Sequence, residues 1–105
     1  MALKIPVDQR QISAFCRRWK IVELDFFGSV LRDDFRLESD VDVLVAFSPD
    51  AAWSLFDHVK MEEELTAILG RKVDLVSRRS VERSPNWIRR NDILKSLEPA
   101  YVASR

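Results

Sequence analysis

Apolar residues recur along the chain with two different spacings, and these predict helices that alternate with short strands. Within positions 8–20, apolar side chains stand three and four residues apart, which is typical of one helix face: Ile12, Phe15, Cys16 and Trp19. A second helix is predicted at 51–69 with Gly70 ending it, and a third begins near Ser84-Pro85-Asn86. Runs of β-branched and aromatic residues predict strands at 21–27, 40–47 and 72–76.

The order of these elements predicts an α/β (α+β) fold with a small mixed β-sheet flanked by helices. A helical turn at 30–34 would separate the first two strands, and Ser48-Pro49-Asp50 would end the second. In the last helix the residues available for burial, until Pro99 interrupts the pattern, are Ile88, Ile93, Leu94 and Leu97. The chain has 105 residues, of which 47% are apolar, and this is enough for one core. We therefore expect a single domain over 1–105, with its core at about 8–98.

Charge and composition narrow the classes of protein without selecting one. The 17 basic and 17 acidic residues cancel, so the overall charge does not demand a nucleic acid or a membrane as partner. No apolar run approaches the roughly 20 residues of a membrane span, and the first residues lack the apolar stretch of a signal peptide. Cys16 is the only cysteine, which suits a reducing compartment, and we expect a cytoplasmic protein.

A basic segment at 78–95 includes Trp87 and admits two interpretations. Base stacking on Trp87 would suit RNA. We favour the alternative, a surface that receives an acidic partner or the phosphates of a nucleotide, so direct binding of nucleic acid is not expected. The single histidine, His58, is interpreted as a packed or rim residue of its helix rather than a base or a ligand.

The residues with the most chemical information are Gly28-Ser29 and, after ten further residues, Asp40 and Asp42. Side chains alternate across a strand, so Asp40 and Asp42 would share one face, about 7 Å apart. Two carboxylates at that separation favour a divalent cation, and Mg²⁺ prefers oxygen ligands of this kind. Asp74 interrupts another apolar strand, where an isolated carboxylate is costly, and it would complete a cluster of three if the two strands pair.

Each of these residues also has a purely structural interpretation. Gly28-Ser29 could be a strand-to-helix turn in which Ser29 caps the helix. Asp40 and Asp42 could be solvent-facing acids at a strand edge, and Asp74 could form a salt bridge with an arginine. The spacing of the whole set favours the chemical interpretation over these.

The combination resembles the signature of the DNA polymerase β-type nucleotidyltransferase superfamily, in which a Gly-Ser turn precedes an Asp-x-Asp strand. It is similar, more narrowly, to the minimal nucleotidyltransferases, or MNT proteins. The resemblance continues through the helix ending at Gly70, the strand at 72–76 and the segment 86–97. It implies a polymerase β-like nucleotidyltransferase fold and covers most of the chain.

The resemblance implies nucleotidyl transfer from ATP with two Mg²⁺ ions. Asp40 and Asp42 would hold both ions, and Asp74 would hold the one that activates the acceptor hydroxyl. The β and γ phosphates would lie on Gly28 and Ser29, with Arg32 reaching a phosphate. A salt bridge from Arg32 to Asp33 or Asp34 is the alternative role of that arginine. Many family members have glycine where this chain has Asp33, and the added negative charge could weaken binding of the triphosphate.

The resemblance also implies a partner, a HEPN-family toxin, with the MNT protein as an antitoxin that transfers AMP to a toxin tyrosine. Two other functions stay open. One is a binding module that neutralises its partner sterically without catalysis. The other is transfer of the nucleotide to a small molecule of the aminoglycoside type. The base of the nucleotide, the number of AMP units and the state of assembly, monomer, homo-oligomer or hetero-oligomer, are not specified by the sequence.

Overall fold

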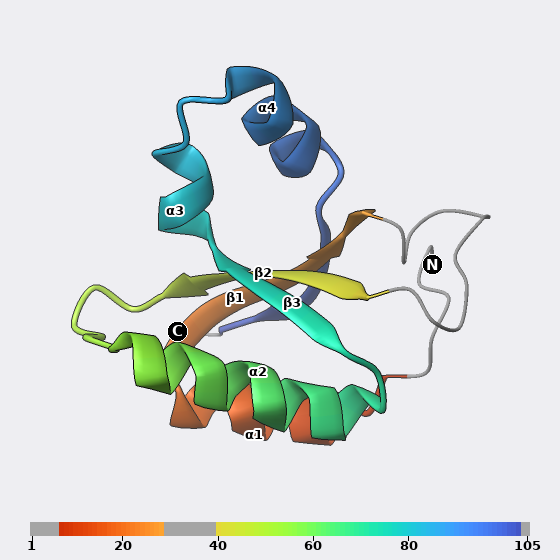
Figure 1. The fold of residues 1–105 in the computed structure, drawn as a ribbon. Coiled ribbons are helices and arrows are strands. Elements are labelled where there is room, and N and C mark those ends of the chain that lie inside the picture. Colours follow the sequence, from red (N-terminus) through yellow and green to blue (C-terminus); the bar gives the residue numbers. More distant parts are fainter. Residues whose placement is uncertain (1–6, 29–39, 104–105) are drawn as a thin grey trace.

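The computed structural model describes residues 7–28 and 40–103. In this part of the chain a sheet lies between two pairs of helices, with α1 and α2 on one face and α3 and α4 on the other (Figure 1). No helix among the described residues has the length and apolar character that a membrane span needs. The elements, in chain order, are α1 (Gln9–Arg18), β1 (Ile21–Phe27), β2 (Val41–Phe47), α2 (Leu55–Leu69), β3 (Val73–Ser77), α3 (Arg78–Glu82), α4 (Trp87–Lys95) and β4 (Glu98–Val102).

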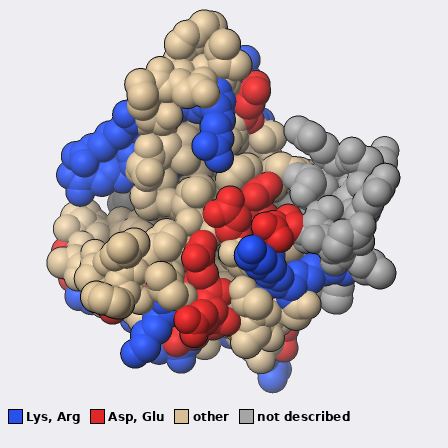
Figure 2. Space-filling model, viewed as in Figure 1, with Lys and Arg blue, Asp and Glu red and all other residues tan. Residues whose placement is uncertain are grey.

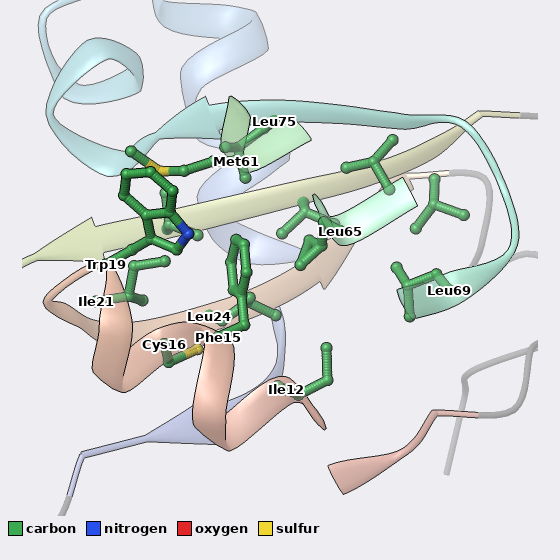
Figure 3. Packing of buried hydrophobic residues seen from close by; sticks show 14 of the residues in the cluster. Ile12, Phe15, Cys16, Trp19, Ile21, Leu24, Met61, Leu65, Leu69 and Leu75 are labelled. Carbon is green, nitrogen blue, oxygen red and sulfur yellow. The ribbon is translucent and has the colours of Figure 1, made fainter. Parts of the chain in front are cut away.

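Helix α1 forms where the three-and-four spacing predicts it. The side chain of Asp8 caps its start, accepting hydrogen bonds from the backbone N–H of Arg10 at 3.0 Å and of Gln11 at 3.4 Å. Its apolar face is fully buried against the sheet (Figure 3). Within that face, burial raises the pKa of the Cys16 thiol to about 12, so this cysteine is a packing residue.

Helix α2 begins four residues later than the predicted position 51. Ser54 and Asp57 form a capping box, in which the Ser54 N–H donates to Asp57 Oδ2 at 2.9 Å and Asp57 N–H donates to Ser54 Oγ at 3.3 Å. The predicted end is confirmed, because Gly70 adopts the left-handed conformation with φ of 70°.

The sheet is mixed, as predicted, with strand order β3-β2-β1-β4. Strand β1 pairs antiparallel with both β2 and β4, whereas β2 and β3 run parallel. A parallel pair needs a crossover, which α2 supplies. The two central strands, β1 and β2, therefore have neighbours on both sides, and β3 and β4 form the edges.

Alternation along β2 assigns its residues to the two faces of the sheet. Val41, Val43 and Val45 belong to the larger core under α1 and α2, part of which Figure 3 shows. Leu44 belongs instead to a smaller cluster on the opposite face, with Phe27 of β1, Val81 of α3 and Ile93 of α4. Asp42 is two residues from Leu44 and so faces α4.

The structure differs from the sequence-based expectation in two further elements and in the burial of α4. Helix α3 and strand β4 were not predicted, so the sheet has four strands in the described part rather than three. Ile88, expected to be buried, is 58% exposed. Ile93 alone of the apolar residues in α4 is fully buried, because this short helix covers only the edge of the smaller cluster.

Candidate functional site

The end of β1 brings a glycine directly against a carboxylate of β2. Phe27 is paired in register with Asp42, and Gly28 follows with φ of 76°. A Cβ atom added to Gly28 would collide with Asp42 Oδ2 and would lie 3.2 Å from Asp42 Cγ. Gly28 therefore meets two requirements that other residues do not, the left-handed backbone and the close approach to the Asp42 carboxylate.

The same aspartate is paired with Asp74 across the parallel strands β2 and β3. Paired residues on neighbouring strands lie about 4.8 Å apart at their backbones and project to the same face of the sheet. Asp42 is half-buried, whereas Asp74 is exposed. The pairing of these strands, which was the condition for a cluster of aspartates, is present. Asp74 is exposed although Val73 and Leu75 on either side of it are buried, because it projects to the opposite face of the edge strand β3.

Asp40 lies immediately before β2 and is exposed. Ser29 and Arg32, with neighbouring Asp33, lie outside the described residues. Within 7–28 and 40–103, no three His, Cys, Asp or Glu side chains are grouped closely enough to form a metal site. The set of Asp40, Asp42 and Asp74 as a joint metal site therefore stays a prediction, with the Asp42–Asp74 pairing as its structural basis.

A cavity of about 520 Å³ opens beside Gly28 and Asp42 and is closed on its other side by α4. The face of α4 that lines it has the spacing of one helix side, Arg89, Asp92, Ile93 and Ser96. Arg89 lines the cavity that holds Asp42, although 46 residues separate the two in the sequence. The basic segment was predicted to receive phosphates or an acidic partner, but its sequence did not identify Arg89 as the residue that shares a cavity with Asp42.

The donor set suits a hard divalent cation. Asp42 and Asp74 offer carboxylate oxygens from adjacent strands on one face, and the cavity leaves room for a ligand beside Asp42. Figure 2 shows acidic side chains gathered on this side of the molecule, next to the part drawn in grey. Because like charges at this separation repel, a cation between the carboxylates would stabilise the arrangement. The residues present therefore fit Mg²⁺.

Two other acidic residues, both on α2, make contacts with neighbouring elements. Glu62 accepts a hydrogen bond from the Leu75 N–H at 2.9 Å, and Glu64 accepts one from Trp19 Nε1 at 2.7 Å. His58 is partly exposed, and its Nε2 lies 3.8 Å from Glu62 Oε2. This agrees with its interpretation as a rim residue.

Comparison with known proteins gives relatives of one kind. A protein adenylyltransferase, MntA, of Thermococcus cleftensis is 40% identical over 65 residues, covering 62% of this chain. The match spans 64% of that relative's own length. A solved structure of a putative minimal nucleotidyltransferase is 34% identical, with a TM-score of 0.66 and 87% of each chain covered.

Two solved complexes share the fold at 18% identity. A toxin–antitoxin complex with AMP-PNP has a TM-score of 0.70 and covers 93% of this chain and 76% of its own. A complex of a tri-AMPylated HEPN toxin with an MNT antitoxin, from Shewanella oneidensis, has a TM-score of 0.60. The match covers 90% of this chain and 70% of the chain in that complex. These likenesses confirm the expected minimal nucleotidyltransferase fold.

The nucleotidyltransferase domain family matches residues 9–98, which include all the described residues of the site. The match runs from the first residue of α1 to the first residue of β4. With Gly28 packed on Asp42 and Asp42 paired with Asp74, the chain belongs to the nucleotidyltransferase domain family.

Proposed function

We propose that this protein transfers AMP from ATP to a hydroxyl group, that of a tyrosine on a HEPN-family toxin, and so acts as an antitoxin. The observation that carries the proposal is the close packing of Gly28 on Asp42, beside Asp74 and above a cavity large enough for a nucleotide. The MntA relative and the complexes of MNT and HEPN proteins support the choice of AMP and of this partner.

In this mechanism the attacking hydroxyl oxygen forms a bond to the α phosphorus while the bond from the α phosphorus to the bridging oxygen of the β phosphate breaks. Pyrophosphate leaves, and Asp74 takes the hydroxyl proton, directly or through water. Asp42 and Asp40, with Asp74, would hold Mg²⁺, which neutralises charge on the attacking and leaving oxygens when bound. The absence of a side chain at Gly28 gives the phosphates access to backbone N–H groups.

Arg89 is expected to bind a phosphate of ATP, because its side chain lines the cavity opposite Asp42. No carboxylate among the described residues forms an ion pair with it. Arg89→Ala should raise the KM for ATP roughly 10-fold with a smaller change in kcat, since it removes one charge-assisted hydrogen bond. Arg83→Ala, at an exposed arginine outside this cavity, is the matched control. An unchanged KM in Arg89→Ala would remove this residue from the site.

The proposed reaction is tested by incubating the protein and its HEPN partner with ATP labelled at the α or the γ phosphate. Label from the α position should remain on a partner tyrosine, and label from the γ position should not. Chelation of divalent cations with EDTA should abolish labelling, and added Mg²⁺ should restore it. Transfer of the γ label, or labelling that persists in EDTA, would contradict the proposal.

Steric neutralisation without catalysis is the second candidate function. The observation that favours it is the distance between the carboxylates of the site and a group of exposed apolar side chains. Leu55 and Phe56 are exposed on α2, at the opposite end of the sheet from Asp42. Partner binding could therefore proceed without the carboxylates. The double variant Asp40→Asn and Asp42→Asn separates the two functions in cells that express the toxin. Loss of protection with the complex intact supports catalysis, whereas full protection supports steric neutralisation.

A further inference from the structure

A second cavity, of about 350 Å³, lies at the carboxyl ends of the parallel strands β2 and β3. Its apolar walls include Phe47, Trp53 and Met61, and its polar rim includes Ser77, His58 and Arg79. Along β2, Asp42 is about 10 Å from Val45 and about 16 Å from Phe47, the two residues of that strand that line the second cavity. A ligand in one cavity would therefore leave the other accessible.

The surface next to this cavity is apolar and exposed. Three side chains of the first turns of α2 are directed to solvent: Leu55 is 78% exposed, Phe56 is 86% exposed and Val59 is 45% exposed. The buried face of the same helix is formed by Met61, Leu65 and Leu69. The three exposed side chains are therefore not needed for the core. Adjacent large apolar side chains on a surface are typical of an interface with another protein.

The rim of the cavity includes one guanidinium, that of Arg79, which has no ion pair with a carboxylate among the described residues. Arg79 is exposed. The neighbouring Arg78, by contrast, is paired with Glu82 at 3.2 Å. Figure 2 shows blue side chains over α3 and a tan, uncharged surface over the start of α2. The complementary ligand has an apolar side chain with a carboxylate close beside it.

We propose that Leu55, Phe56, Val59 and Arg79, with the 350 Å³ cavity between α2 and α3, form a docking surface for the partner protein. The partner segment places an apolar side chain in the cavity against Trp53 and a carboxylate on Arg79. This inference rests on the proposed function for the identity of the partner. The new element is the place where that partner binds. This surface is far enough from the catalytic carboxylates to leave the nucleotide cavity free.

The test measures the Kd between the full chain and its HEPN partner by isothermal titration calorimetry. Phe56→Ser and Arg79→Glu should each weaken binding at least about 10-fold, as expected for a buried aromatic and a buried arginine at an interface. Trp87→Ser and Arg83→Glu are matched controls, at an exposed aromatic and an exposed arginine outside this surface, and should bind as wild type does. Affinity for an ATP analogue should not change in any of the four variants.

The outcomes distinguish this inference from the proposed function. If wild type binds the partner and all variants bind equally well, the docking surface is wrong and the proposed function stands. If wild type neither binds nor labels a HEPN partner, the proposed function fails and the docking inference fails with it. Sedimentation of the chain alone provides a further check. A homodimer that Phe56→Ser dissociates would assign the surface to a second copy of this chain and overturn the inference.

Discussion

Replacing Gly28 by alanine is expected to reduce AMP transfer roughly 100-fold, because a displacement of about 1 Å at a catalytic group has effects of that size. The added methyl group would occupy the space of Asp42 Oδ2, so the carboxylate must move. Moving it disturbs its alignment with Asp74 on the neighbouring strand. The substitution also places a Cβ at φ of 76°, which costs about 1 kcal/mol of stability.

Gly70→Ala is the matched control for that experiment. Gly70 has nearly the same backbone conformation, with φ of 70°, but nothing lies within 4 Å of a Cβ built on it. The two variants should therefore lose a similar amount of stability from backbone strain, while Gly70→Ala keeps wild-type activity. Urea unfolding and initial rates of labelling measure the two effects separately. Equal activity in both variants would show that contact between Gly28 and Asp42 is not required for catalysis.

The second large effect is expected at Asp25, a carboxyl group in the middle of the sheet that is 1% exposed. Its neighbours in register are Leu44 on β2 and Pro99 on β4, and Pro99 has no N–H to donate. Asp25 Oδ1 has no hydrogen-bond partner among the described residues. Burial, followed by the adjacent carboxylates of Glu23 and Glu98, raises the pKa of Asp25 to about 7, and Arg78 acts in the opposite direction.

This raised pKa makes the protein less stable as pH increases. Between about pH 4 and pH 7 the folded protein retains the Asp25 proton that the unfolded chain has released, so the free energy of unfolding falls with pH. The loss is complete above pH 7. Asp25→Asn removes the ionisable group and keeps its shape, and should therefore stabilise the protein at pH 8 by roughly 2 to 4 kcal/mol.

The measurement is urea unfolding, followed by tryptophan fluorescence, at intervals from pH 4 to pH 8. Wild type should lose stability across this range, and Asp25→Asn should lose much less. Asp50→Asn is the control, because hydrogen bonds from Ser48 and Lys20 lower the pKa of that exposed carboxyl. Asp50→Asn should not raise the free energy of unfolding at pH 8. If Asp25→Asn is less stable than wild type at pH 8, the charged form of Asp25 is tolerated in the fold.

Asp25 and Asp74 show where local sequence reasoning succeeds and where it fails. Both are single carboxylates within apolar strands, in Leu24-Asp25-Phe26 and Val73-Asp74-Leu75. The cost of a carboxylate in an apolar strand was considered only for Asp74, yet Asp74 is exposed and Asp25 is buried. The difference depends on position in the sheet, since β1 is central and β3 is an edge. Strand order follows from tertiary pairing, which the alternation of residues does not reveal.

The elements that were predicted have strong local signals, and those that were missed do not. Spacing of apolar residues and capping residues located α1, α2 and α4, and β-branched runs located β1, β2 and β3. Helix α3 has one buried residue, Val81, and β4 contains Pro99, which is unusual in a strand interior. β4 forms because β1 offers it an unpaired edge.

The site, like the fold, was predictable where its residues have a local sequence signal. Gly28 and Asp42 belong to a motif with a defined spacing, Asp74 follows on a later strand, and the strand pairing shows that Asp42 and Asp74 are neighbours. Arg89 and the cavity beside it depend on how α4 returns over the end of β1, which no local pattern specifies. The exposed apolar residues of α2 were likewise absent from the expectation, because a helical apolar pattern does not state which of its residues face solvent.

A crystal structure of the protein with Mg²⁺ and α,β-methylene-ATP tests the central claim most directly. The account predicts that Mg²⁺ lies at the carboxylates of Asp42 and Asp74 with the α phosphate next to it, and that the remaining phosphates pass Gly28 towards Arg89. A nucleotide bound in the cavity between α2 and α3, or bound with its phosphates away from Asp42, would contradict it.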